Sequence, residues 1–74
     1  MSQLEPHYSM VIEWSDEDLK YVVSFPEWGP ATHTHGATYE EAVKNGSEVL
    51  SDLVQLWGEL GRPLPVPRVF AASV

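Results

Sequence analysis

One stretch of this sequence has the hydrophobic period of an α-helix, and it limits the architectures open to the rest of the chain. Over residues 39–60, apolar side chains recur at steps of three and one, which predicts a helix with one apolar face. Thr38 and Glu41 form a capping box at its start, where the hydroxyl accepts from the Glu41 amide and the carboxylate reaches back to the Thr38 amide. Gly61 and Pro63 predict its end. The apolar face of a helix has to be buried against another element, so we expect the remaining segments to form a sheet on which the helix packs.

Two runs of alternating apolar and polar residues precede the helix and predict a β-hairpin. Residues 8–14 and 20–25 each alternate with a period of two, as half-buried strands do. The acidic segment 15–18 between them is rich in residues that bond their own backbone, so we expect it to form the turn. Pro26 ends the second strand, directly after Phe25, because proline cannot donate to a strand ladder.

The remaining segments complete a small sheet. Residues 31–35 have β-branched side chains at alternate positions and predict a short third strand. Three prolines force residues 62–67 into an extended return segment. Residues 68–72 predict a fourth strand, either on this sheet or added to a neighbour's. The predicted fold is therefore α+β, a small antiparallel sheet in the order β-β-β-α-β with one long helix packed on one face.

Two glycines lie where the predicted layers meet. Gly36 follows the third strand, and we expect its backbone to need a conformation that only glycine adopts at little cost. Gly46 lies on the apolar face of the helix, where glycine costs about 0.5–1 kcal/mol relative to alanine. We expect Gly46 to let the helix approach the sheet closely.

Length and charge narrow the class of protein. The 74 residues make one domain, 1–74, with residues 1–7 as a loose lead-in. A chain of this size buries only about 60% of the surface that its unfolded form exposes. There is no cysteine for a disulfide or a thiolate zinc site. We therefore expect a homo-oligomer or a partner to supply the missing stability.

Eleven acidic residues against four basic ones give a formal charge of −7. This balance excludes a basic face for direct nucleic-acid binding. An acidic surface attracts basic partner proteins; the alternative is that the charge only keeps the protein soluble. No apolar run approaches the ~20 residues of a membrane span, and the N-terminus lacks the basic and apolar regions of a signal peptide. We expect a cytoplasmic protein that does not contact membranes.

Few residues are candidates for chemistry. His33 and His35 would share one face of the third strand, and two imidazoles so spaced can hold a metal. The pattern supplies no third ligand, so two solvent-facing polar side chains are the simpler interpretation. The carboxylates gather in the turn and on the helix, where such groups are usually solvated, and no nucleophile or phosphate-loop motif is present. The sequence therefore predicts no catalytic residue, no cofactor and no enzyme activity.

Scattered apolar side chains predict a contact surface instead. Val11 and Val22 fall on the sheet face opposite the predicted helix, among polar residues. Val54 falls about 100° off the centre of the apolar helix stripe. The loop tryptophan Trp28 looks exposed, and Phe70 follows the proline-rich segment. Aromatic side chains are enriched at interfaces, although single exposed apolar residues are also normal. These five residues are the candidate interface.

Several short motifs stand in a fixed order along the chain. The opening strand is 8–13, the hairpin ends in Phe-Pro-acid at 25–27, a glycine precedes Thr-x-Glu-Glu-Ala at 38–42, and Pro-x-Pro at 63–65 follows the helix. Over about residues 8–70, this order and spacing resembles the HicB-like antitoxin family, small domains from bacterial and archaeal toxin–antitoxin pairs.

The resemblance implies a partial ribonuclease-H-like fold without its catalytic acids. It also implies that family members bind and mask a small basic RNA-cleaving toxin and form dimers or larger assemblies. We therefore expect a non-enzymatic antitoxin; the alternative is a solitary homo-oligomeric domain with a different protein partner. Many relatives carry a C-terminal DNA-binding domain, and because this sequence stops at Val74 we expect none here. The motif residues with an implied structural role are Phe25, Pro26, Gly36, Thr38 and Glu41.

Overall fold

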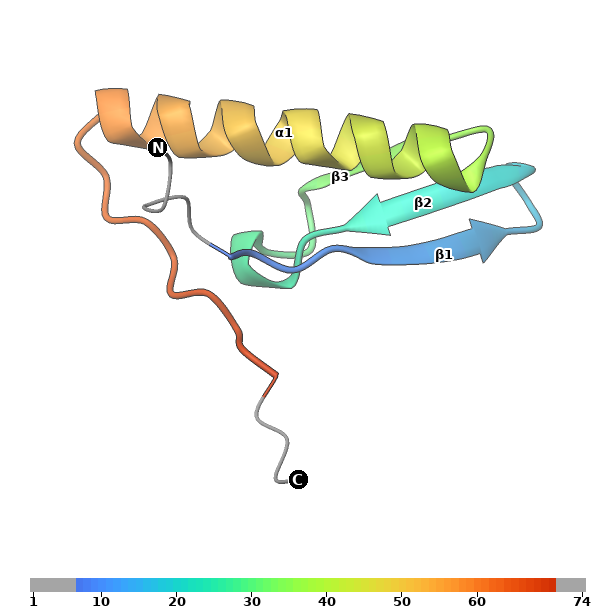
Figure 1. Cartoon of the computed structure of the whole chain (residues 1–74), viewed down its shortest axis with the longest axis horizontal. Coiled ribbons are helices and arrows are strands. Elements are labelled where there is room, and N and C mark those ends of the chain that lie inside the picture. The colour runs from blue at the N-terminus through green and yellow to red at the C-terminus, as the bar shows by residue number, and fades with distance from the viewer. Residues whose placement is uncertain (1–6, 71–74) are drawn as a thin grey trace.

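A three-stranded antiparallel sheet followed by one long helix makes up the computed structural model, which describes residues 7–70 (Figure 1). The helix packs on one face of the sheet, which confirms the predicted α+β class. The strands lie side by side in the order β1-β2-β3, so that β1 and β3 are the edges. In chain order the elements are β1 (Val11–Ser15), β2 (Lys20–Ser24), the 3₁₀ helix η1 (Pro26–Trp28), β3 (His33–Gly36) and α1 (Tyr39–Glu59).

β1 and β2 form the predicted hairpin. Val11 pairs with Ser24 at its open end and Ser15 with Lys20 at the turn. The Ser15 hydroxyl accepts from the Asp18 amide at 3.2 Å, as short polar side chains do in turns. The acidic turn was therefore predicted correctly from its composition.

The first strand is shorter than predicted. Residues 8–10 were expected to open it, but they precede β1 without strand pairing. The reason lies in a distant side chain, because the Ser9 amide donates to both oxygens of the Glu27 carboxylate, at 3.1 and 3.2 Å. An amide bound in this way is not available to a neighbouring strand.

α1 begins and ends at the predicted signals. The Thr38 hydroxyl accepts from the Glu41 amide at 3.1 Å, which confirms the first half of the capping box. The Glu41 carboxylate accepts from the Ala37 amide at 2.6 Å, one residue earlier than predicted. At the C-terminus Gly61 has a φ of 68°, and the Arg62 amide donates to the Trp57 carbonyl at 3.0 Å, completing a Schellman motif.

Close approach explains both interior glycines. A Cβ on Gly46 would lie 2.5 Å from Met10 Sδ and 3.2 Å from Val23 Cγ1, which confirms that Gly46 lets α1 approach the sheet. Gly36 was expected to need a special backbone conformation, and this was wrong, because positive φ among the described glycines is confined to Gly29 and Gly61. Close packing explains Gly36 instead. A Cβ atom at this position would lie 2.8 Å from the Cα atom of Ala42, in the first turn of α1.

The core is small and lies to one side of the sheet. Val23, Phe25 and Ala42 are fully buried, so the Phe-Pro motif places its phenylalanine at the centre. α1 packs mainly on β3, less on β2 and least on β1. The helix-facing side of β1 is therefore only partly covered. Half-buried apolar side chains surround the core: Met10, Ile12, Tyr21, Trp28, Val49 and Leu50.

An aromatic cluster continues the packing beyond the end of the sheet. Trp28 makes edge-to-face contacts with Tyr8 and with Trp57, with ring centroids 5.0 Å apart in each pair. The Arg62 guanidinium lies over the Trp57 ring, 5.2 Å from its centroid, in cation–π geometry. The second half of α1 is thus held by η1 and by the segment that follows the helix.

The last predicted strand does not form over its described residues. Residues 62–70 make no strand, and residues 71 and 72 of the predicted strand lie outside the described part. The Arg68 amide donates to the Glu27 carboxylate at 2.8 Å instead of to a ladder. We call residues 62–70 the tail; it passes the start of β1 and then projects away from both layers (Figure 1).

Acidic residues along α1 make it too polar for a bilayer, and no helix in the described part of the chain could cross a membrane.

The two-layer packing predicts opposite effects for two glycine-to-alanine changes. Gly36→Ala should lower the free energy of unfolding by about 2–3 kcal/mol, because the new methyl group meets the backbone of α1. Gly58→Ala should raise it by about 0.5–1 kcal/mol, because Gly58 is helical with open space around it. Urea unfolding followed by circular dichroism measures both. A Gly36→Ala variant as stable as the native chain would contradict the close approach.

Candidate interaction surface

One face of the sheet is not covered by any described element. Ile12, Tyr21 and Val23 pack toward α1, so the alternate residues of each strand point to the opposite side. The strand register arranges these side chains in cross-strand rows. We call this surface the open face; it consists of Val11, Glu13, Ser15, Lys20, Val22, Ser24, His33 and His35.

The open face contains the two histidines and two of the predicted interface residues. Val22 lies between Glu13 and His35 in one row, and Ser24 lies between Val11 and His33 in the next. Val11 is 40% exposed, and both histidines are exposed. Apolar, acidic and imidazole groups therefore alternate on one flat surface.

His33 and His35 share a face, as the spacing predicted. The described residues bring no third ligand to them, because 7–70 contain no group of three His, Cys, Asp or Glu side chains placed to hold a metal. Two imidazoles alone do not make a zinc site, which needs at least three protein ligands. Both imidazoles are exposed on the open face.

A single carboxylate, Glu27, fastens the tail to the start of the sheet. Its oxygens accept from the Ser9 amide and hydroxyl and from the Arg68 amide, at 2.8 to 3.2 Å. Nearby, the Tyr8 hydroxyl donates to the Pro65 carbonyl at 2.6 Å. Three segments distant in sequence therefore meet at η1.

Burial and hydrogen bonding act in opposite directions on Glu27. Desolvation by burial raises the pKa of its carboxyl, but the amides of Arg68 and Ser9 and the Ser9 hydroxyl outweigh that and hold the pKa below its ordinary value. For Tyr8, desolvation and then the negative charge of Glu27 raise the pKa of the phenol. Both groups are therefore held in their usual forms at neutral pH, Glu27 charged and Tyr8 protonated.

A hollow of about 360 Å³ opens between the start of β1 and the tip of the tail. Its walls include Val11 of the open face and Phe70 of the tail. Phe70 is 89% exposed and Val69 78% exposed, so the tail's own aromatic ring does not fill the space. The remaining lining residues are Ser9, Pro26, Arg68 and Val69.

The structure separates the five predicted interface residues. Val11 and Phe70 line the same hollow, and Val22 lies beside Val11's row on the open face. Trp28 was expected to be exposed, but it is half-buried in the aromatic cluster, and its Nε1 is buried without a hydrogen-bond partner among the described residues. Val54 is half-buried on α1, away from the open face.

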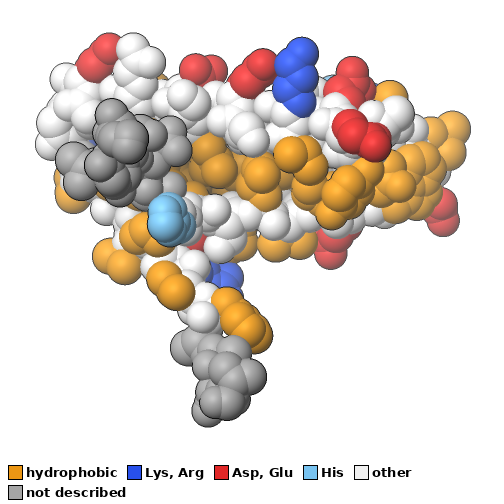
Figure 2. Space-filling model, viewed as in Figure 1, with side chains coloured by type: hydrophobic (Ala, Val, Ile, Leu, Met, Phe, Trp, Pro, Cys, Tyr) orange, Lys and Arg blue, Asp and Glu red, His pale blue; other side chains and the backbone are white. Residues whose placement is uncertain are grey.

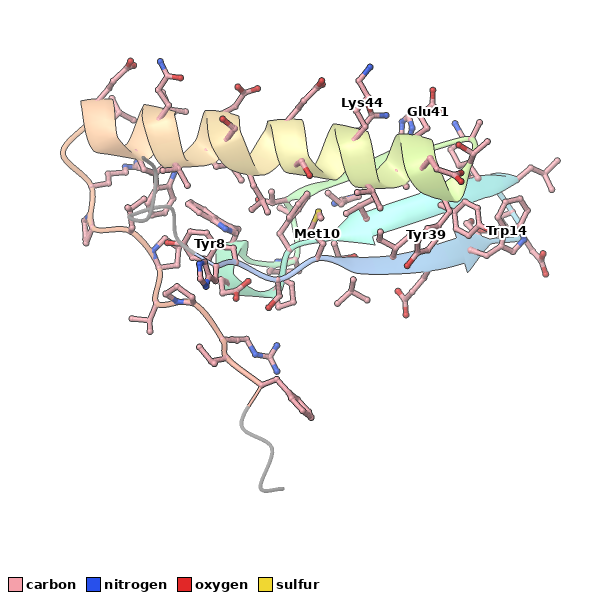
Figure 3. The ribbon with its side chains drawn as sticks, viewed as in Figure 1. Tyr8, Met10, Trp14, Tyr39, Glu41 and Lys44 are labelled. Atoms are coloured by element: carbon pink, nitrogen blue, oxygen red, sulfur yellow. The ribbon has the colours of Figure 1, made fainter. Side chains whose placement is uncertain are left out.

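A second apolar surface was not predicted. Because α1 lies over β3 and β2, a band of apolar side chains stays visible between α1 and β1, with acidic side chains above and below it (Figure 2). Trp14 is 49% and Tyr39 55% exposed, and both rings pack edge-to-face on Tyr21. Figure 3 shows Met10, Tyr39 and Trp14 along this band. The period of residues 8–14 predicts a half-buried strand and that of residues 39–60 an apolar helix face, but neither period shows that the helix is displaced to one side of the sheet.

The residues around Glu27 were also missed. Its partners Ser9 and Arg68 are 18 and 41 positions away in the sequence, and no local pattern joins them. The one available signal was the acidic residue directly after the Phe-Pro step, which was interpreted only as part of a motif.

Comparison with known proteins does not extend these observations: no family model matches the chain, and no curated protein or solved structure matches it significantly. The resemblance to the HicB-like family therefore stays a prediction from the motifs.

The Glu27 contacts predict a pH-dependent contribution to stability. Because the folded-state pKa lies below the ordinary value of 4.5, the ionised carboxylate favours the folded state above that pH, and the contribution is lost as the pH falls through the folded value. Glu27→Gln should therefore cost about 1 kcal/mol at neutral pH, and the difference from the native chain should vanish in acid.

Urea unfolding between neutral and acidic pH measures this difference. The matched control is Glu48→Gln, which changes an exposed carboxylate on α1 that makes no side-chain hydrogen bond to another residue of 7–70. It should leave the unfolding midpoint close to native at each pH. An equal loss for both variants, or a Glu27→Gln difference that persists in acid, would contradict the role given to Glu27.

Proposed function

We propose that this chain is a non-enzymatic, acidic binding protein of the cytoplasm that acts as an antitoxin by covering a small basic RNA-cleaving toxin. The observation that carries the proposal is the open face, where Val11 and Val22 stand exposed or half-exposed on a domain of formal charge −7. A basic protein would be attracted by the charge and held by the apolar contacts. The motif order of the HicB-like family supports the choice of partner.

The positions of the acidic groups fit binding better than catalysis. Acid–base catalysis needs convergent carboxylates in a cleft. Here the acids of the hairpin turn and of α1 are exposed, and Glu27 is occupied by Ser9 and Arg68. The toxin's activity would be blocked by covering its surface, with no chemistry from this chain.

A second candidate is a solitary homo-oligomeric domain that serves another pathway. The small core favours it, because only three apolar side chains are fully buried among the described residues. A domain of this size with so small a core gains from pairing with a copy of itself. The two candidates differ in whether a basic partner is needed.

The discriminating experiment is co-expression with the product of the neighbouring reading frame, which the antitoxin proposal expects to be a short basic protein, followed by purification and an RNA-cleavage assay. The antitoxin proposal expects a stable complex in which cleavage is suppressed in proportion to the amount of this chain. Association should slow markedly between about 0.05 and 0.5 M salt, because exposed charges are screened over that range. No complex and undiminished cleavage would refute the proposal.

A surface variant locates the contact. Val22→Lys places a positive charge at the centre of the open face and should weaken binding by about tenfold or more, because the new cation would be desolvated against a basic partner. Leu56→Lys is the control, since Leu56 is 49% exposed on α1 and lies off the open face. Isothermal titration measures both, with circular dichroism to verify folding. Equal affinities for the two folded variants would exclude the open face as the contact.

A further inference from the structure

The two edges of the sheet are not equally available. At β3, the side-chain amide of Asn45 donates to the His35 carbonyl at 2.8 Å, and α1 packs closely against the strand. β1 pairs only with β2 within the described residues, so its outer backbone groups have no strand partner. An unpaired strand edge is a template for another extended segment.

The tip of the tail is such a segment. Residues 66–70 have no regular structure; only Val69 and Phe70 follow Arg68, the residue that Glu27 binds, and the end of the described chain projects away from the body (Figure 1). Val66 is 83% exposed, Val69 78% and Phe70 89%. Three large apolar side chains held in solvent on one extended segment indicate a binding element without its partner surface.

The tail and the rest of the chain carry net charges of opposite sign. All eleven acidic residues precede residue 60, whereas Arg62 and Arg68 follow it with no acidic residue after them. The tail is therefore basic and the body strongly acidic. A tail would be attracted to the body of a second copy, and β1 offers Glu13 beside Val11.

We propose that the tail tip, Arg68–Phe70, adds as an antiparallel strand to the β1 edge of a second copy, and that the exchange is reciprocal and closes a twofold dimer. This proposal does not depend on the proposed function. With Arg68 opposite Glu13, the period of strands places Phe70 opposite Val11 on the open face and Val69 opposite Ile12 on the helix side.

This register gives partners to side chains of the tail tip that are exposed in the single chain. Arg68 gains an acidic cross-strand neighbour, and apolar side chains meet apolar ones at the other two positions. Phe70 of the second copy would enter the hollow beside Val11, which the chain's own Phe70 leaves open. Pro67 precedes the added strand, a position where proline does not break pairing.

The tip cannot reach this register on its own β1. The Arg68 amide is held by Glu27 beside Ser9, at the start of β1, while Glu13 lies four residues further along. Four residues of extended chain span about 13 Å, so Arg68 and Glu13 of one chain are kept apart. Direct pairing of two β1 strands is the alternative arrangement at this edge. If that pairing were centred on Glu13, the Glu13 carboxylates of the two copies would lie opposite each other, and like charges so placed are destabilising.

Cross-linking between two single-cysteine variants tests the register, because the chain has no cysteine of its own. Glu13→Cys and Arg68→Cys, prepared with tags of different size, are mixed and oxidised under mild conditions. Opposed residues of antiparallel strands have Cβ atoms about 4.5–5.5 Å apart, close enough for a disulfide after small adjustment. The mixed disulfide should form in clear excess over both homodimers.

The matched control replaces Glu13→Cys by Glu48→Cys, an exposed position on α1, which should give no excess of mixed disulfide with Arg68→Cys. Light scattering on the native chain should find a dimer. Three results would each overturn the proposal: a monomer at all concentrations, a predominance of Glu13→Cys homodimers, or an internal disulfide within a monomer when one chain carries both Glu13→Cys and Arg68→Cys.

Charge reversal gives an independent test at the same pair. Glu13→Arg and Arg68→Glu should each raise the dimer dissociation constant by about tenfold, because each places like charges opposite one another. The double variant restores the opposite-sign pair and should return the constant to near the native value. Additive losses in the double variant would show that these residues do not face each other.

Discussion

The contact between the end of β3 and the first turn of α1 determines the rest of this structure. Gly36 lacks a side chain at the point where the backbone of Ala42 crosses it, so the two elements approach more closely than any other residue would allow. The helix is thereby anchored over β3 at its N-terminus. With α1 on that side of a three-stranded sheet, β1 receives little cover, and its apolar side chains stay visible between the layers. One missing Cβ therefore decides both where the core lies and which edge remains open.

Glu27 has a comparable role at the other end of the molecule. It follows the proline that ends β2, and the single turn of η1 aims its carboxylate at the amides of Ser9 and Arg68. Around it, Tyr8, Trp28 and Trp57 form an aromatic cluster that supports the half of α1 extending past the sheet. A chain with so few fully buried residues thus relies on a second, partly exposed cluster to hold its long helix.

Local signals were sufficient for most of the fold, and distant contacts explain the rest. The helix caps at Thr38 and Gly61 and the acidic hairpin turn each depend on residues within a few positions of one another. The early part of the first strand and the fourth strand were wrong for a shared reason, since Glu27 binds the Ser9 and Arg68 amides that those strands would have used. The open face followed from the period of two. The exposed band beside β1 did not, because periodicity gives the direction of a side chain but not the lateral position of the layer above it.

The asymmetry of the two sheet edges also sets a limit on assembly. A sheet that accepts a strand at both edges can grow without end, which is the geometry of fibres. Here Asn45 occupies the His35 carbonyl and α1 crowds β3, so that strand addition to the described part of the chain is directed to β1. A reciprocal exchange at that one edge closes a twofold dimer, because both β1 edges are then occupied. One hydrogen bond of 2.8 Å from the Asn45 side chain therefore occupies a backbone acceptor of β3, at the edge where a further strand would otherwise pair.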